Sequence, residues 1–264
     1  MSLFTKIPNQ TIKDLAIKEK PKERHKLNQI YTYCHIMHNI SGKAYSAICC
    51  EIKIAKHFIN SNNKSFDWNS PKCDYYVDNQ RRSITNYIKY LKSKSLFKEI
   101  KKERYEDHYE NRYFFVEPND GYSIIWKDFY EDESIPTEHK GLLILLKTLC
   151  LNGTNHFYYK SYEDIAKNEL HMDSDLFRKM VKDLKDMNQI IEIDKCIIII
   201  NENFRLYIDE TRYENIIYGT IYKFCLDKGV VPPCKNETQM KNFSIIEGKR
   251  TDEGFMALLH SRFP

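Results

Sequence analysis

One short segment of the sequence concentrates the side chains that could contact a polyanion. Residues 79–104 contain nine Lys/Arg and two Asp/Glu, a net charge of +7, although the whole chain carries only +4. The positive charge is therefore local. Arginine can hold guanine through two hydrogen bonds, asparagine can do the same with adenine, and lysine neutralises phosphates. The segment predicts contact with double-stranded DNA, through binding that weakens steeply as salt rises.

The same segment has helical periodicity, which would place its polar side chains on one face. Apolar residues recur three and four positions apart after Asp78, a suitable N-cap. The opposite face and the segment after it hold the predicted DNA-binding residues. They are Arg81, Arg82, Thr85, Asn86, Lys89, Lys92, Lys98, Lys101, Lys102 and Arg104. A merely solvated basic surface is the alternative, and the coincidence of charge with both helix and strand favours DNA contact.

Catalytic alternatives depend on one acidic cluster near residue 108. Asp107, His108 and Glu110 could suggest a metal-dependent nuclease, and Tyr109 a nucleophile that transfers a DNA strand. Both chemistries need groups that converge from several elements, and no partner set is visible. The sequence also lacks a Gly-rich phosphate loop and a G-x-S-x-G motif. We therefore expect a solvated hairpin tip, with no enzyme activity, metal or cofactor.

Cysteine and hydropathy patterns predict a cytoplasmic protein. None of the eight cysteines forms a C-x-x-C pair, and Cys34 with His38 would supply only half a metal site. Free, buried thiols in a reducing compartment are the expected state. No apolar run approaches the ~20 residues of a membrane span, and the N-terminal sequence lacks the apolar core of a signal peptide. We expect no contact with a membrane.

The elements that must position the basic residues have the order of a winged helix-turn-helix. Apolar spacing predicts a helix over 27–40, and a second apolar segment, 44–59, also reads as helical. After the basic helix, β-rich sequences at 96–101 and 112–116 predict two strands joined by a charged ten-residue interval. Residues 1–24 read as a polar N-terminal arm.

The same order of elements is predicted a second time. An apolar helix is followed by a short capped helix, a third amphipathic helix and two strands around a tight turn. A further helix is expected over 209–229. The boundaries of the second set are marked by Ser134 or Thr137, Asn152–Gly153, Ser161 with Asp164, and Asp194–Lys195.

The fold class that follows is mainly α with small β-hairpin wings (α+β). It consists of two tandem winged helix-turn-helix units plus a C-terminal helical extension. The predicted segments are the arm at 1–24, a first, DNA-reading unit at 25–118, a second unit at 119–208 and the extension at 209–264.

About a third of the chain, within 122–193, resembles the helix-turn-helix modules of phage and plasmid replication proteins from low-GC bacteria. The likeness lies in a strand, a helix with Lys140-Gly141-Leu142-Leu143, a helix with Ile165-Ala166, a third helix and a wing. Asn188-Gln189 stands where those modules have a glycine before the wing strand. The resemblance implies DNA binding by a replication initiator, a replisome organiser or a transcription regulator.

The second unit differs from the first in charge. Residues 122–207 contain 11 Lys/Arg and 15 Asp/Glu, a net charge of −4. The third helix of this unit mixes secondary DNA-binding candidates with acidic residues. The candidates are Arg178, Lys179, Lys182 and Lys185. Because DNA repels an anionic module, we expect the second unit to mediate dimerisation or partner contact, with secondary DNA contact as the alternative.

These patterns predict sequence-specific binding of double-stranded DNA by a homodimer. The expected role is a plasmid or phage replication initiator or replication control protein, with host replication or transcription proteins as further partners. A transcription regulator of a mobile element is the nearest alternative. A winged-helix docking module that binds an acidic protein and no DNA is an alternative of another class.

Overall fold

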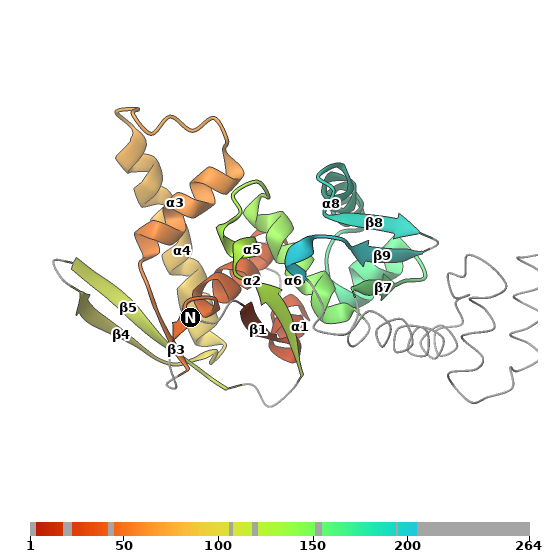
Figure 1. Ribbon diagram of the computed structural model, residues 1–264, viewed down its shortest axis with the longest axis horizontal. Helices are drawn as coiled ribbons and strands as arrows, with labels where there is room; N and C mark the ends of the chain where they lie inside the picture. Colours follow the sequence, from red (N-terminus) through yellow and green to blue (C-terminus); the bar gives the residue numbers. More distant parts are fainter. Residues whose placement is uncertain are drawn as a thin grey trace, which may run out of the picture.

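A computed structural model describes residues 4–17, 23–41, 45–105, 108–117, 121–150, 155–193 and 195–204 (Figure 1). The fold is a mixture of helices and small antiparallel sheets, which confirms the coarse fold class. The predicted helix over 209–229 and the rest of the C-terminal extension lie outside these ranges. Within them, no helix combines the length and the hydropathy needed to cross a bilayer.

The N-terminal segment is folded where a polar arm is predicted. Strand β1 (Phe4–Pro8) leads into helix α1 (Asn9–Ile17), and β1 pairs antiparallel with β6 (Tyr122–Trp126). Ile7 and Ile12 are completely buried. The prediction of a polar arm is therefore wrong for this part. Its few apolar residues are spaced so that each reaches the core, and the polar residues between them mask the pattern.

The first group of elements surrounds the basic segment. A four-stranded antiparallel sheet has the order β2-β3-β5-β4, and Figure 1 shows helices α3 and α4 beside each other at that end of the molecule. The elements are α2 (Glu23–Met37), β2 (Ile40–Ser41), β3 (Ser46–Cys49), α3 (Glu51–Asn62), α4 (Cys73–Ser93), β4 (Phe97–Tyr105) and β5 (His108–Phe115).

Several boundaries in this group differ from those predicted, among them that of the helix predicted over 27–40, which spans Glu23–Met37. Helix α4 begins at Cys73, so Asp78 lies inside the helix, because buried Val77 extends the apolar stripe toward the N-terminus. Strands β4 and β5 extend into the charged interval, to Tyr105 and from His108, where a loop is predicted. Residues 46–49 form strand β3, although the segment reads as helical, because they pair with β5 and the sheet contacts outweigh the local pattern; Ser46, Ala47 and Cys49 are buried.

The second group repeats the element order and the strand pairing of the first. If the short strand β2 of the first group is set aside, each group consists of a helix, a strand, two helical segments and two strands, and the strand orders are β3-β5-β4 and β7-β9-β8. The elements are α5 (Asp128–Glu131), α6 (Thr137–Leu149), β7 (His156–Tyr158), α7 (Tyr162–Asp164), the π-helix η1 (Ile165–Glu169), α8 (Ser174–Asp186), β8 (Ile190–Ile193), β9 (Cys196–Ile199) and the 3₁₀ turn η2 (Glu202–Phe204).

Capping residues and a proline explain where several helices of this group begin. The Ser161 hydroxyl oxygen accepts a hydrogen bond from the Asp164 backbone N–H, at 3.1 Å, which confirms the predicted cap of α7. The Asp173 carboxylate caps α8 in the same way. Helix α6 starts at Thr137, one of the two predicted starts, and follows Pro136. The predicted end at Asn152–Gly153 lies outside the described residues.

The two groups share one core. Helices α2 and α6 lie against each other, and the buried side chains of both groups form a continuous hydrophobic cluster. The closest approach is at Gly141, where an added Cβ would lie 2.2 Å from the Leu27 carbonyl oxygen. Only glycine lets the two backbones come so near. The two units predicted on either side of position 118 therefore do not have separate cores.

Candidate nucleic-acid interface

Helix α4 presents most of the predicted DNA-binding residues to solvent. Ile84 and Leu91 are completely buried on its apolar side, which packs on α3 and α2. Side chains on the opposite side are exposed, and in the described part of the chain none of the basic ones forms an ion pair with a carboxylate. They are Arg82, Asn86, Lys89 and Lys92. This set is called the basic face below.

Two other α4 candidates are engaged within the protein. Arg81 forms an ion pair with Asp78, with 3.4 Å between Nη2 and Oδ1. The Thr85 hydroxyl donates a hydrogen bond of 2.6 Å to Oε2 of Glu51, at the start of α3, and Thr85 is only half-exposed. The Thr85 hydroxyl thus links α4 to α3. Its hydroxyl is therefore already satisfied before any base approaches.

Glu51 also connects the basic helix to the β4–β5 hairpin. Its second carboxylate oxygen, Oε1, accepts a hydrogen bond of 2.9 Å from the Asn111 side chain on β5. One carboxylate thus fixes the helix, through Thr85, and the hairpin, through Asn111. Sequence reasoning did not find Glu51 or Asn111. No local pattern marks them, because the contact spans 60 residues.

The hairpin divides its basic residues between two faces. The β4–β5 register places Lys102 and Arg104 on the same face as the buried Tyr113, and Lys101 on the other face. Lys102 Nζ lies 4.5 Å from the centre of the exposed Tyr109 ring. Lys101 Nζ lies 3.1 Å from Oε2 of Glu99. Among the described residues, Lys102 and Arg104 form no ion pair with a carboxylate, in contrast to Lys101, so both can meet a phosphate.

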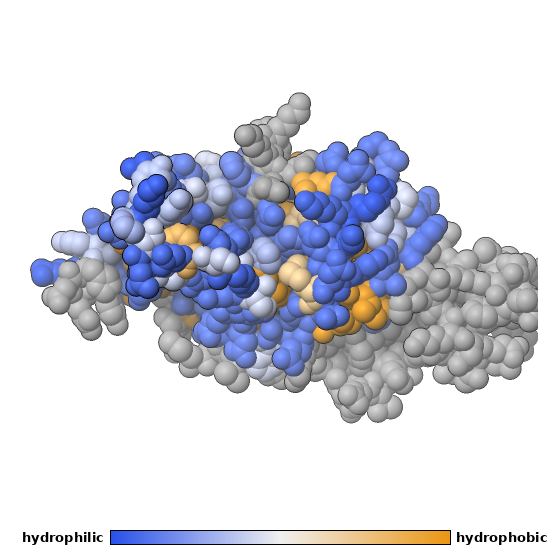
Figure 2. All heavy atoms as spheres, turned by 90° about the horizontal axis from the view of Figure 1, so that it is seen from above, coloured by the Kyte–Doolittle hydropathy of each residue, from blue (hydrophilic) through white to orange (hydrophobic). Residues whose placement is uncertain are grey.

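Lys98 is the remaining predicted DNA-binding residue on β4. Lys98 is exposed and falls at the irregularity in strand pairing between Phe97 and Glu99. Figure 2 shows a largely hydrophilic surface, on which apolar residues form separate small areas.

Two of the basic residues on α8 form ion pairs with carboxylates, whereas those of the basic face do not among the described residues. Arg178 Nη1 lies 2.9 Å from Asp175 Oδ1, and Lys185 Nζ lies 2.7 Å from Glu192 Oε2. The other two secondary candidates, Lys179 and Lys182, are exposed. Half of the predicted secondary set is thus engaged in ion pairs, which reduces the net positive charge that this helix presents.

The acidic cluster near residue 108 lies only partly within the described residues. Asp107 lies outside the described residues. In the ranges that are described, no three His, Cys, Asp or Glu side chains gather as metal ligands would.

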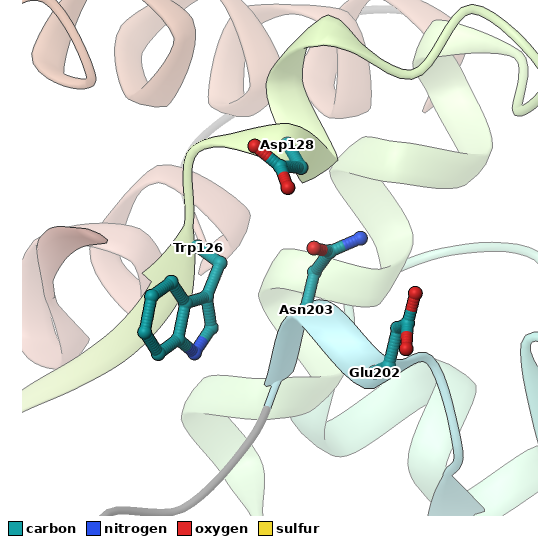
Figure 3. Close-up of a pocket in the computed structure, with 4 residues that line it drawn as sticks. All are labelled: Trp126, Asp128, Glu202 and Asn203. Atoms are coloured by element: carbon teal, nitrogen blue, oxygen red, sulfur yellow. The ribbon is translucent and has the colours of Figure 1, made fainter. Parts of the chain in front are cut away.

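A cavity of about 180 Å³ lies away from the basic face (Figure 3). It is lined by Trp126 on β6, Asp128 on α5, and Glu202 and Asn203 on η2. Because it contains two carboxylates, this cavity is unsuited to phosphate.

Comparisons with known proteins add no assignment. No protein-family profile, no curated protein and no solved structure matches this chain.

Proposed function

We propose that the protein binds double-stranded DNA in a sequence-specific manner through α4 and the β4–β5 hairpin. The observation that carries the proposal is the basic face. Arg82, Asn86 and Lys89 are exposed opposite the buried apolar stripe. Arginine and asparagine can read base edges in the major groove, and lysine can neutralise phosphates. In this proposal both element groups are winged helix-turn-helix units, in which α4 is the reading helix.

The β4–β5 hairpin acts as the wing of the first unit. Lys102 and Arg104 contact the DNA backbone or the minor groove beside the reading helix. The Glu51 carboxylate holds helix and hairpin in one arrangement, since it accepts hydrogen bonds from both. A preformed angle between them lowers the ordering cost of binding two parts of one DNA site.

The second unit serves assembly in this proposal. Two of its four basic α8 residues are paired with carboxylates, so it attracts DNA less than the first unit does. A homodimer formed through this unit would place two reading helices on half-sites about one helical turn apart. Its DNA targets would then be repeated or palindromic.

The biological role that we propose is initiation or control of replication on a plasmid or phage, in the cytoplasm. It is supported by the resemblance of residues 122–193 to modules of such replication proteins. Transcription control of a mobile element uses the same DNA-binding chemistry. The position of the bound DNA, next to an origin or next to a promoter, distinguishes the two roles.

The first test is recovery of sheared genomic DNA from the source organism with the purified chain, at two salt concentrations. We expect one repeated or palindromic locus, whose recovery falls as salt rises. The double variant Arg82→Ala/Lys89→Ala should lose that locus and keep its folded circular dichroism spectrum. The matched control, Arg178→Ala/Lys182→Ala, should retain it.

Two outcomes would contradict the proposal. Retention of the locus by Arg82→Ala/Lys89→Ala, with loss in the control, would assign DNA reading to α8 instead of α4. No DNA retained even at low salt would overturn DNA binding altogether. The basic face would then be assigned to an acidic protein partner, as in the docking alternative.

A further inference from the structure

A pocket of about 280 Å³ lies between the end of α3 and the start of α4. Phe58 and Ile59, both buried in α3, line it together with the rings of Phe66 and Tyr76. A cavity of ~150 Å³ is enough to hold a benzene ring. The pocket therefore has room for a flat ring of the size of a nucleobase.

Two side-chain amides in this pocket make no hydrogen bond among the described residues. Asn79 and Gln80 line it and are half-buried, and neither amide group makes a hydrogen bond to another described residue. Asn62, which also lines the pocket, differs because its amide is bonded to Thr137. A free amide offers a donor beside an acceptor, which is the pattern needed to recognise the edge of a base.

Aromatic side chains gather at the edge of the pocket. Phe66 contacts Trp68 and Tyr76, with ring centres 4.8 Å and 5.7 Å apart, and Tyr75 contacts Tyr76 at 5.8 Å. The alternative is that these rings form a small core that closes the connection between α3 and α4. Tyr75 is 65% exposed and Tyr76 is 47% exposed, so they contribute little to such a core. Exposed rings are the usual stacking partners of unpaired bases.

Charge at the pocket favours an uncharged ligand. The sequence from Lys56 to Asp78 contains three Lys and three Asp, so it has no net charge apart from histidine. Asn79 precedes Arg82 by three positions and Asn86 by seven, and residues at these spacings lie on the same side of a helix. The edge of the pocket thus continues into the basic face, where phosphates would bind.

We propose that this pocket receives a single unpaired base from DNA that is held on the basic face of α4. The inference rests on the proposed function, because the basic face must supply the phosphate contacts. The Asn79 and Gln80 amides would hydrogen-bond the edge of the base, and an aromatic ring at the pocket edge would stack on its face. The protein would therefore favour DNA in which one base is already out of the helix.

The test compares two duplexes of the same sequence, one fully paired and one with a single bulged 2-aminopurine. Binding to the full-length chain is measured at low salt, where affinity depends little on sequence. We expect about tenfold tighter binding of the bulged duplex, together with a change in 2-aminopurine fluorescence as the base enters the pocket. The double variant Asn79→Ala/Gln80→Ala should bind both duplexes equally, with the affinity of the wild type for the paired one.

Further variants separate the pocket from the basic face. Ser83→Leu fills the pocket from the α4 side and should also abolish the preference. Gln10→Ala/Asn168→Ala, which removes two exposed amides elsewhere, should keep it. Circular dichroism melting identifies any variant that fails to fold.

Three outcomes would overturn the inference. Equal affinity of the wild type for both duplexes would overturn it while leaving the proposed function in place. A preference that survives in both Asn79→Ala/Gln80→Ala and Ser83→Leu would do the same. No binding of either duplex would overturn the inference and the proposed function together.

Discussion

The Lys26 ammonium group lies 2.7 Å from the backbone carbonyl oxygen of Leu170, a residue 144 positions further along the chain. Lys26 is almost completely buried and also donates to the carbonyl oxygens of Ala16, at 3.0 Å, and His171, at 3.1 Å. These acceptors follow or end helical segments, where the backbone dipole is negative. One lysine on α2 therefore ties α1 and the second element group to the first.

The first prediction concerns this lysine. Lys26→Met keeps much of the side-chain volume but leaves three carbonyl groups without this donor, so we expect it to lower the free energy of unfolding by roughly 2–3 kcal/mol. Urea denaturation measures the loss. Lys182→Met, on the exposed side of α8, should change stability by less than about 0.5 kcal/mol. Equal effects of the two substitutions would show that the carbonyl contacts contribute little.

The second prediction concerns the approach of α2 to α6. Gly141→Ala would place a methyl group 2.2 Å from the Leu27 carbonyl oxygen, so the helices must move apart. We expect a loss of about 3 kcal/mol in the free energy of unfolding, measured by thermal denaturation. Gly121→Ala is the matched control, because its nearest neighbour, Asn9 Nδ2, is 3.9 Å away. A stable Gly141→Ala variant would contradict the close packing of these helices.

The elements were more predictable from the sequence than the contacts between them. The apolar stripe of α4 and the Ser161 cap arise from residues within one or two helical turns, so local spacing reveals them. The start of α4 was missed because its first residue follows Lys72, which makes no side-chain cap. The Lys26–Leu170 and Glu51–Asn111 contacts do not show in the sequence, since a lysine or glutamate that bonds a distant residue looks the same there as one that faces solvent.

The candidate site was predictable to a similar degree. Charge and periodicity indicate that Arg82, Asn86 and Lys89 lie opposite the apolar stripe, and the structure places them there. Periodicity also assigned Thr85 to that group, but its hydroxyl is bonded to Glu51. The division of β4 between two faces depends on strand register, which the sequence does not determine.

The third prediction concerns a buried polar cluster formed by α2, α3 and α6. Its histidines stay neutral in the folded state, because burial lowers the pKa of His57 to about 3 and that of His38 to about 4. The Lys140 ammonium group, 3.5 Å from His57 Nε2, further lowers the His57 pKa. Neighbouring His35 also has a lowered pKa, through burial first and then because protonated His35 would be repelled by His38 and His57 if they were protonated, and by the Lys140 ammonium group.

The sign of the pH dependence follows from these shifts. Histidine in an unfolded chain titrates near 6.5, so below that pH the unfolded state binds protons that the folded state does not. Stability is therefore fully present above about pH 6.5 and falls with pH toward 4. By pH 5 we expect a loss of roughly 1–2 kcal/mol for each of His38 and His57. Urea denaturation at a series of pH values measures it.

A variant identifies the group responsible for the pH dependence. His57→Gln retains a side-chain amide that can hydrogen-bond the Tyr31 hydroxyl, which lies 2.8 Å from His57 Nε2. It should make the stability curve shallower between pH 5 and 6.5, a window above the range in which most carboxylates titrate. An unchanged slope in this variant would mean that His57 does not contribute.

The last prediction tests how the wing meets DNA. Each lysine or arginine that neutralises a phosphate contributes about 0.9 to the slope of log affinity against log salt concentration. Lys102 and Arg104 share the face of the hairpin that carries Tyr113, whereas Lys101 lies on the other face beside Glu99. Lys102→Ala/Arg104→Ala should therefore lower the slope by about two, and Lys101→Ala should leave it nearly unchanged. Fluorescence anisotropy with a labelled duplex, at several salt concentrations, measures both slopes. A decrease of about 0.9 in the slope for Lys101→Ala would mean that the opposite face of the hairpin meets the DNA. The orientation proposed for the wing would then be wrong.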